Sequence, residues 1–221
     1  MTAVLIPALN AALTLPQLLA SLKPLVAGGS VVVVDDGSTD ETAAVAKAAG
    51  VVVLRHEVNR GKGAALRTGF DYVASSSGHD SVITMDADLQ HDPKDVPKFL
   101  SAWEAGNSDL ILGYRRRIGS GMPFHRVLSN SITSALVSAR TGIRIRDSQT
   151  GFRLIGRRVL SALVIQADGY EAETEILIKA ARMGFRIAGV PIATIYSGAP
   201  SHMTHWTTTK RFLQVLLREY K

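Results

Sequence analysis

The sequence of 221 residues contains no cysteine, which excludes disulfide bonds and thiolate metal sites. It also lacks any apolar run near the roughly 18 residues that a membrane-spanning helix requires, and its N-terminus does not follow the signal-peptide pattern. We therefore expect a soluble or peripheral protein located in the cytoplasm. If it is peripheral, it would attach to the cytoplasmic face of a membrane.

Three familiar signatures of nucleotide and metal chemistry are missing as well. There is no GxGxxG fingerprint, no GxxxxGK[ST] phosphate loop and no HExxH motif. These absences argue against a dinucleotide-binding fold. Of the histidines, only His91, beside an acidic stretch, and the pair His202 and His205 lie near other candidate residues.

Acidic residues are scarce in one segment. Between Tyr114 and Arg158 there are ten arginines and one acid, Asp147, which is a local charge of +9 in a chain whose net charge is +6. A basic field of this strength favours an anionic partner, either nucleic acid, a phosphorylated ligand or a membrane surface. A solvated basic face without a partner is the alternative.

Short apolar runs alternate with helical patterns over the first 113 residues. This order predicts an α/β fold with a mostly parallel central sheet flanked by helices. The rhythm changes after residue 113, but no repeat or linker is visible, so we expect one domain over 1–221 with halves 1–113 and 114–221. The expected strands are 2–6 (ended by Pro7), 30–34, 51–54, 82–85, 109–112 and 185–190, with 147–153 expected as loop and strand. The expected helices are 13–26, 40–49, 64–75, 93–105, 124–140, 173–183 and 207–220.

The most informative stretch is VITMDADLQHD, residues 82–92. If the strand direction persists beyond the apolar run, Asp86 and Asp88 point to the same side, because side chains alternate along a strand. Two carboxylates this close repel each other unless a cation lies between them, and oxygen ligands suit Mg²⁺ or Mn²⁺ with substrate phosphates completing the shell. Open α/β sheets bind ligands at this end of their strands. The alternative is a solvated acidic turn in which Asp92 caps the next helix.

Two other groups belong to the same half. Asp35 and Asp36 follow the strand SVVVV, where a carboxylate could accept a hydrogen bond from a nucleobase or a ribose hydroxyl, or simply stabilise a turn. The run Gly61-Lys62-Gly63 starts a helix and could bind a phosphate through backbone N–H groups, although this is weak evidence alone.

Asp147 is the isolated acid of the basic segment. Burial beside Arg146 or Arg153 would give it a purely structural role. It could equally orient a substrate hydroxyl or accept a proton from one.

Taken together, these stretches resemble glycosyltransferase family 2, and within it the polyprenyl-phosphate glycosyltransferases of the dolichyl-phosphate mannose synthase group. The matching stretches are VVVVDDGSTDET, NRGKGAALRTGF, ITMDADLQHDP, DSQTGFR and GYEAETEILIKAARMGFRIAGVPI. They occur in the expected order over about residues 2–200. The resemblance implies a single nucleotide-sugar-binding domain of the GT-A type, with Mg²⁺ or Mn²⁺ as cofactor.

The resemblance also implies roles for individual residues. Asp86, Asp88 and Gln90 match the metal site, and Arg126 and Asn130 match an acceptor-phosphate site. Asp88 and Arg115 match catalytic positions, and Asp147 is the remaining candidate for one. The positions matching the nucleotide-sugar pocket are Pro7, Leu9, Val34, Asp36, Asp86, Ala87, Asp88, Arg115 and His202.

Two departures from the family pattern matter. The usual Pro-x-Tyr-Asn-Glu is here Pro7-Ala8-Leu9-Asn10-Ala11, which loses an aromatic and a carboxylate expected at the nucleotide. The membrane helices that many relatives carry after the last helix are also missing.

We therefore predict an inverting, metal-dependent glycosyltransferase. It would move a hexose from a nucleotide diphosphate sugar to a polyprenyl phosphate at a membrane surface, with a membrane protein as an optional partner. A soluble hydroxyl acceptor, with Asp147 as base, is the second prediction. The third prediction is a non-catalytic protein that binds lipid or nucleic acid. Such a binder needs no metal, so the acidic strand end would have no purpose in it, and we therefore expect no nucleic-acid partner.

Overall fold

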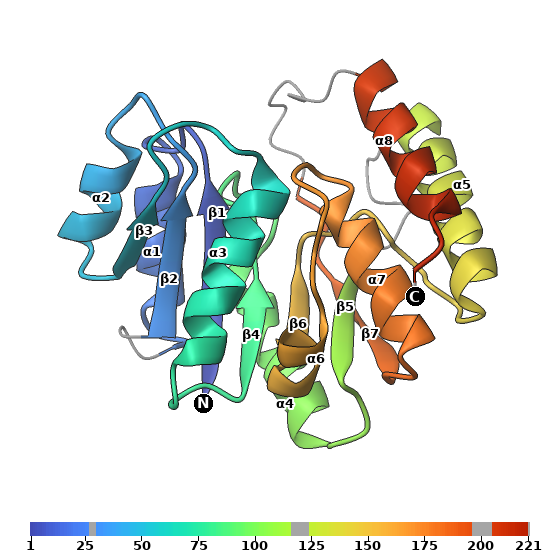
Figure 1. Ribbon diagram of the computed structural model, residues 1–221. Coiled ribbons are helices and arrows are strands. Elements are labelled where there is room, and N and C mark those ends of the chain that lie inside the picture. The colour runs from blue at the N-terminus through green and yellow to red at the C-terminus, as the bar shows by residue number, and fades with distance from the viewer. Residues whose placement is uncertain (27–29, 116–123, 196–204, 221) are drawn as a thin grey trace.

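The computed structural model describes residues 1–26, 30–115, 124–195 and 205–220, and only the backbone of 124–126 and 205–208. Its described strands form one seven-stranded sheet in the order β3-β2-β1-β4-β6-β5-β7 (Figure 1). All neighbouring pairs are parallel except those that involve β6, which runs antiparallel between β4 and β5. The prediction of a mostly parallel sheet is confirmed. The strands are β1 (Thr2–Ala8), β2 (Val31–Asp35), β3 (Val52–Arg55), β4 (Ser81–Thr84), β5 (Leu110–Arg115), β6 (Arg153–Gly156) and β7 (Ile187–Ile192).

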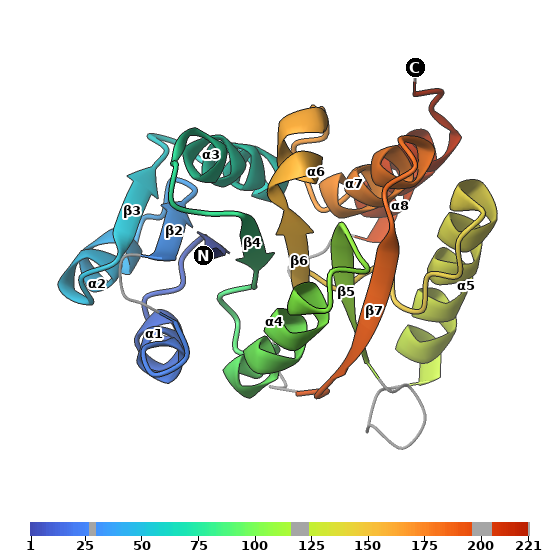
Figure 2. The same cartoon turned by 90° about the horizontal axis from the view of Figure 1, so that it is seen from below.

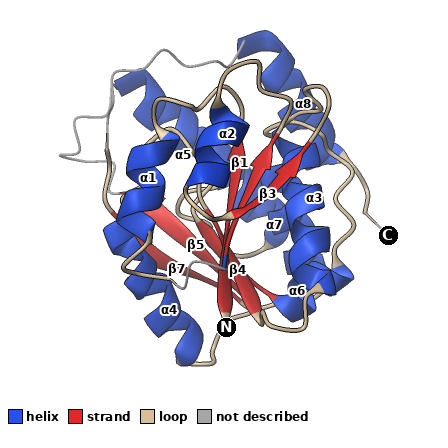
Figure 3. Ribbon diagram, turned by 90° about the vertical axis from the view of Figure 1, so that its left-hand side faces the viewer, coloured by secondary structure: helices blue, strands red, loops and turns tan. Residues whose placement is uncertain are grey.

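Helices cover both faces of this sheet. Seen from below, α3, α6, α7 and α8 lie on one side and α1 and α4 on the other (Figure 2), and the end-on view shows the same layers (Figure 3). The helices are α1 (Leu15–Leu22), α2 (Thr42–Ala48), α3 (Lys62–Ser75), the 3₁₀ turn η2 (Pro93–Asp95), α4 (Val96–Glu104), α5 (Phe124–Thr141), α6 (Arg157–Ala162), α7 (Ala172–Arg182) and α8 (His205–Leu217).

The strands β2 and β4, and most of β1, are buried on both faces, which explains why they read as continuous apolar runs rather than alternating ones. In β1, Ala3 and Leu5 join the core under α3 and α7, while Val4 and Ile6 join the core under α1 and α4. The strands thereby hold the loops at their carboxyl ends on a rigid platform, at the upper edge of the sheet in Figure 1.

Pro7 does not end β1, contrary to our prediction. The Leu5 carbonyl accepts a hydrogen bond from Met85 on the β4 side, and the Ala8 carbonyl accepts one from Asp36 on the β2 side. The nitrogen of Pro7 therefore faces the β4 side, where the pairing with β4 has already ended at Thr84. A proline costs nothing where no N–H is needed by the ladder.

The loop and strand expected over 147–153 is a loop as far as Phe152, and the short strand β6 begins only at Arg153. It pairs with β4 and β5, which links the second half of the chain into the middle of the sheet. The loop before it contains Asp147 to Gly151, so this insertion brings the basic segment beside the carboxyl end of β4.

Candidate active site

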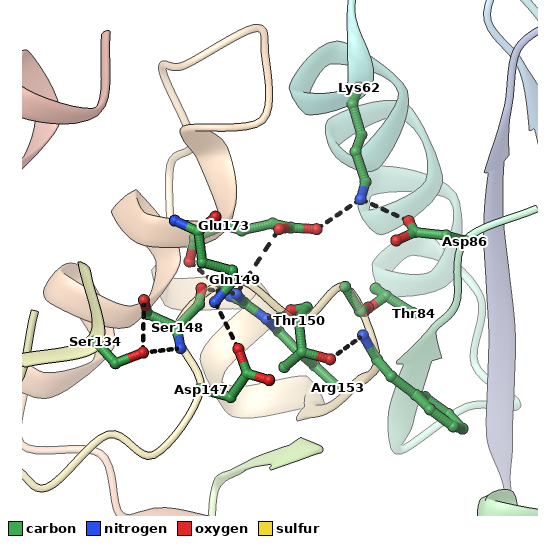
Figure 4. Close-up of polar contacts among 12 residues, drawn as sticks. Lys62, Thr84, Asp86, Ser134, Asp147, Ser148, Gln149, Thr150, Arg153 and Glu173 are labelled. Atoms are coloured by element: carbon green, nitrogen blue, oxygen red, sulfur yellow. Dashed lines mark hydrogen bonds and ion pairs between the residues drawn. The ribbon is translucent and has the colours of Figure 1, made fainter. Parts of the chain in front are cut away.

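One ammonium group connects three elements at the carboxyl edge of the sheet. Lys62 Nζ, at the start of α3, lies 2.5 Å from Asp86 Oδ1 after β4 and 2.7 Å from Glu173 Oε1 on α7 (Figure 4). Burial opposes the charged form of Lys62, but the two carboxylates outweigh it and raise its pKa. Burial also acts to raise the pKa of Asp86, but Lys62, with His91 and Arg153, lowers it on balance. Lys62 and Asp86 are therefore both charged at neutral pH.

Asp88 lies in the exposed turn that follows Asp86. Its Oδ1 accepts a hydrogen bond from the backbone N–H of Gln90 at 3.0 Å, and Leu89 between them has a φ of 62°. Since β4 ends at Thr84, strand alternation does not place the two aspartates, and that part of our reasoning was wrong. Burial raises the pKa of Tyr170, and the Asp86, Glu173 and Asp88 carboxylates raise it further against the effect of Lys62.

His91 supports this turn from beneath. It is buried, its Nδ1 accepts a hydrogen bond from the Asp86 backbone N–H at 3.3 Å, and its ring packs on Phe152. Burial lowers the pKa of His91 more than the Asp86 and Asp88 carboxylates raise it. The imidazole is therefore neutral, with its proton on Nε2, and it holds the backbone of Asp86 in place.

The donor set at this edge fits a hard divalent cation. Within the described ranges, no three His, Asp or Glu side chains are grouped so as to hold a metal by themselves. Asp86, Asp88 and Gln90 offer oxygen ligands, and the ammonium of Lys62 already occupies a cation position against Asp86. Mg²⁺ and Mn²⁺ are commonly held by one or two carboxylates with substrate phosphates completing the shell, so a small donor set suits them.

Gly151 brings the β6 loop against this carboxylate. A Cβ placed at Gly151 would lie 2.6 Å from Asp86 Oδ2, closer than real contacts allow. Thr84, just before, donates its hydroxyl to the Gly151 carbonyl at 2.6 Å. The glycine is therefore required by the close approach of the loop to Asp86.

The predicted nucleotide positions lie side by side at the ends of β1 and β2. Pro7 is opposite Val34 in the parallel register, and Asp36 comes directly after Asp35, the last residue of β2. Asp36 accepts hydrogen bonds from the N–H groups of Arg60 and Gly61, and its Oδ1 lies 2.6 Å from His56 Nδ1. It organises the 56–61 loop and keeps limited capacity for a ligand.

The other predicted pocket positions differ in exposure. Leu9 is 44% exposed, whereas Ala87 is buried. Val34 is fully buried, so its side chain can contribute to a pocket only by packing behind it. His202 lies outside the described residues.

The start of α3 is not a free anion site. Gly63 and Ala64 donate their N–H groups to the Asp168 carbonyl, and Gly61 donates to Asp36. Because these donors are already satisfied by protein oxygens, the expectation that they bind a phosphate was wrong. Only the Lys62 side chain carries charge from this helix end into the site.

Arg115 and Asp147 form a bidentate ion pair at the end of β5. Arg115 Nε donates to Asp147 Oδ2 at 2.8 Å and Nη2 donates to Oδ1 at 3.2 Å, while Gln149 N also donates to Oδ1. Asp147 is 1% exposed. Its partner is therefore Arg115 and not Arg146, whose guanidinium lies over the Tyr114 ring.

Arg153 is a fully buried arginine beneath the loop. Its guanidinium donates to the backbone carbonyls of Thr150, Ser148 and Glu173 at 2.8, 3.0 and 2.5 Å (Figure 4). Burial lowers its pKa, against the opposing effect of Glu173 and Asp147. It fixes the loop 147–151 and the start of α7 relative to each other.

The predicted acceptor residues lie on α5. Arg126 and Asn130 are one turn apart on this helix, and Asn130 is half-buried. Ser134, one turn further, accepts from the backbone N–H of Ser148 at 3.1 Å, so α5 is joined directly to the loop that carries Asp147.

Sequence reasoning missed three members of this site: Lys62 as a side chain, Glu173 and Arg153. Lys62 was visible only as part of a glycine-rich helix start. Glu173 and Arg153 were noted as an acid and a base near other candidates, and no spacing in the sequence indicates that they meet.

These features match a known family. The model of Glycosyl transferase family 2 matches residues 3–164. The chain belongs to glycosyl transferase family 2. Family membership makes it an enzyme that transfers sugars, and the flanked, mostly parallel sheet is the expected GT-A arrangement.

Relatives in this family have lipid-phosphate acceptors in their names. The chain is 31% identical to undecaprenyl-phosphate mannosyltransferase of Micrococcus luteus, over 86% of this chain and 82% of the relative. It is 30% identical to UDP-N-acetylglucosamine–dolichyl-phosphate N-acetylglucosaminyltransferase of Methanococcus voltae, over 76% of this chain and 75% of the relative.

A solved structure with a similar fold has a different kind of molecule in its name. The fold is similar to glucosyl-3-phosphoglycerate synthase of Mycobacterium tuberculosis in complex with Mn²⁺, UDP-glucose and phosphoglyceric acid. The TM-score is 0.79 at 26% identity, covering 98% of this chain and 78% of that one.

Proposed function

We propose that this family 2 glycosyltransferase moves a hexose from a nucleotide diphosphate sugar to a polyprenyl phosphate, with inversion at the anomeric carbon. Residues 1–113 would bind the donor and residues 114–221 the acceptor. The lipid-phosphate acceptors named for the mannosyl- and N-acetylglucosaminyltransferase relatives support this choice.

The engagement of Asp147 is the observation that carries the proposal. A sugar hydroxyl must lose a proton as it attacks, which normally requires a free carboxylate or imidazole. Asp147 is buried and held at both oxygens by Arg115. A phosphate monoester has a second pKa of about 6, so at neutral pH it is already a dianion and needs no base.

The remaining groups of the site suit a phosphate nucleophile and a diphosphate leaving group. Bound Mg²⁺ or Mn²⁺ at Asp86, Asp88 and Gln90 would stabilise charge on the departing diphosphate. Arg115 would present its outer N–H groups to phosphate while Asp147 fixes its orientation. Arg126 and Asn130, on one face of α5, would hold the acceptor phosphate in line with the anomeric carbon.

A small phosphorylated hydroxyl acceptor is the second candidate, favoured by the structural similarity to glucosyl-3-phosphoglycerate synthase. The test is a panel of nucleotide sugars screened with Mn²⁺ for thermal stabilisation, followed by transfer assays with a short polyprenyl phosphate and with 3-phosphoglycerate. We expect glycosylation of the polyprenyl phosphate. Transfer to 3-phosphoglycerate alone would replace the proposal with the second candidate.

The proposal includes peripheral docking at the cytoplasmic face of a membrane. No helix among the described residues is long and apolar enough to span a bilayer. On α5, Leu128, Ile132 and Leu136 are exposed, and α8 beside it exposes Leu213 and Leu217. Neither helix contains an acidic residue. Apolar side chains flanked by cations suit an anionic lipid surface, at about 1 kcal/mol per well-placed cation.

Sedimentation with anionic liposomes tests this docking. The variant with Ile132→Ser and Leu217→Ser should sediment less with the liposomes than the wild type does. High salt should reduce the liposome binding of both proteins. Leu13→Ser is the matched control, because Leu13 is 96% exposed near α1, away from α5 and α8. Equal binding by all three proteins would refute docking through this surface. Absence of binding by the wild type would point to a membrane-protein partner or a soluble acceptor.

A further inference from the structure

Lys62 has two acceptors, and only one of them is a candidate metal ligand. Its ammonium contacts Asp86 and Glu173 at 2.5 and 2.7 Å, and its side chain is 14% exposed. A cation on Asp86 neutralises the carboxylate that a metal needs. Lys62 must therefore loosen its hold on Asp86 when a divalent cation binds there.

The backbone around Lys62 is fixed, so only the side chain can move. Gly61 and Gly63 on either side donate to Asp36 and to the Asp168 carbonyl. A Cβ at Gly63 would lie 2.2 Å from the Ala167 carbonyl oxygen, which shows how tightly this helix start is packed. The flexible stem of Lys62 is what allows the ammonium to shift between its partners.

Glu173 is fixed as well. Its carbonyl accepts from Arg153 Nη1 at 2.5 Å, and its Oε2 lies 4.0 Å from Arg153 Nη2. Its carboxylate is buried, so it cannot swing into solvent. When Asp86 binds a metal, the ammonium of Lys62 can therefore stay in contact with the Glu173 carboxylate, which does not move.

We propose that Glu173 is a positioning residue that sets metal affinity through Lys62. By sharing the ammonium, Glu173 weakens the competition of Lys62 with a divalent cation for Asp86. Lys62 in turn keeps Asp86 compensated when no metal is bound. The inference rests on the proposed metal role of Asp86 and Asp88, and it concerns this chain's own residues before any sugar donor arrives.

The test measures Mn²⁺ binding by the free enzyme in the absence of nucleotide. The electron paramagnetic resonance signal of unbound Mn²⁺ reports how much metal is bound. Lys62→Met removes the competitor, so Mn²⁺ should bind roughly ten- to a hundredfold more tightly. Glu173→Gln leaves the ammonium to Asp86 alone, so binding should weaken severalfold. In the Lys62→Met background, Glu173→Gln should have almost no effect, because its partner is gone. Lys62→Gln replaces Lys62→Met if the latter does not fold.

Two controls separate the failure of this inference from failure of the metal site. Glu171→Gln changes a carboxylate at the start of the same helix, whose Oε1 accepts a hydrogen bond from the nearby Gly169 N, and should leave Mn²⁺ affinity unchanged. Asp88→Ala should abolish binding, and wild-type affinity in that variant would refute the metal site itself. If Asp88→Ala abolishes binding but Glu173→Gln matches the wild type, only the role of Glu173 is overturned. An equal loss from Glu173→Gln with and without Lys62 would also overturn it, because Glu173 would then act directly.

Discussion

Replacing Asp147 with asparagine distinguishes an oriented arginine from a general base. In the structure, Asp147 Oδ2 accepts a hydrogen bond from Arg115 Nε, and Asp147 Oδ1 accepts hydrogen bonds from Arg115 Nη2 and Gln149 N. Asparagine retains one of these oxygens and places an NH₂ group against the guanidinium. One charge-assisted hydrogen bond is lost, which is worth about 1.5–3 kcal/mol. If that loss falls entirely on the transition state, kcat/KM decreases by about tenfold to 150-fold.

The assay measures transfer from the identified donor to a short polyprenyl phosphate from about pH 5 to about pH 9, because this range brackets the second pKa of the phosphate, about 6. In the Asp147→Asn variant the rate should still rise with ionisation of the acceptor phosphate, because no proton on the enzyme is being transferred. In the Arg115→Met background, Asp147→Asn should cause little further loss, because its effect depends on the guanidinium.

Asp109→Asn is the matched control, since Asp109 pairs with Arg186 at the opposite end of the same strand, β5. It should leave kcat/KM unchanged while weakening a more exposed Asp–Arg pair on the same strand. A loss of several thousandfold in Asp147→Asn, with intact folding and donor binding and an equal effect in the Arg115→Met background, would refute the reasoning. It would identify Asp147 as a base and favour a hydroxyl acceptor.

The remaining predictions concern the metal edge, the acceptor and the scaffold. Asp88→Ala should abolish transfer with the fold intact, and EDTA should inactivate the wild type; activity undiminished by either would contradict the metal role. Gly151→Ala should retain the fold but weaken Mn²⁺ binding by roughly ten- to a hundredfold, because its Cβ would lie 2.6 Å from Asp86 Oδ2; unchanged affinity would show that the carboxylate adapts. Arg126→Ala should raise the KM for acceptor far more than the KM for donor, and equal changes would count against an acceptor site. Arg153→Met leaves three buried carbonyls without their donor and should lower the free energy of unfolding by about 3–5 kcal/mol in urea titration; a change under about 1 kcal/mol would contradict its structural role.

The sequence was most informative where local patterns and parallel topology agree. The apolar runs before Asp36 and Asp86 predicted two strands with acids at their carboxyl ends, and β2 and β4 do flank β1 in one sheet. A cap by Asp92 was part of the alternative to the metal site, and its side chain does accept from Lys94 N at the start of the 3₁₀ turn η2. These features depend on neighbouring residues, whose consequences can be worked out from spacing.

The contacts that define the site depend instead on which distant segments meet. The pairing of Lys62 with Glu173 requires α3 and α7 to lie on the same face of the sheet, and the sequence contains no local signal for that. The sequence suggested Arg146 or Arg153 as the structural partner of Asp147, but the insertion of β6 beside β5 brings Arg115 to it instead. The strand geometry invoked for Asp86 and Asp88 ends at Thr84, so a turn and not strand alternation places these two residues.

Both central ion pairs join groups that we assign to substrates and metal. Lys62 compensates Asp86, and Asp147 compensates Arg115, so these two partly buried charges are already paired in the described part of the site. An unpaired charge left in such partly buried positions costs about 3–5 kcal/mol, so pairing them in advance stabilises the folded enzyme. The same pairing means that a metal or a phosphate must exchange partners rather than fill a gap. Such an exchange is favourable only when the incoming charges are themselves matched, as they are for a divalent cation together with a diphosphate. The arrangement therefore favours binding metal and nucleotide sugar together over binding either one alone.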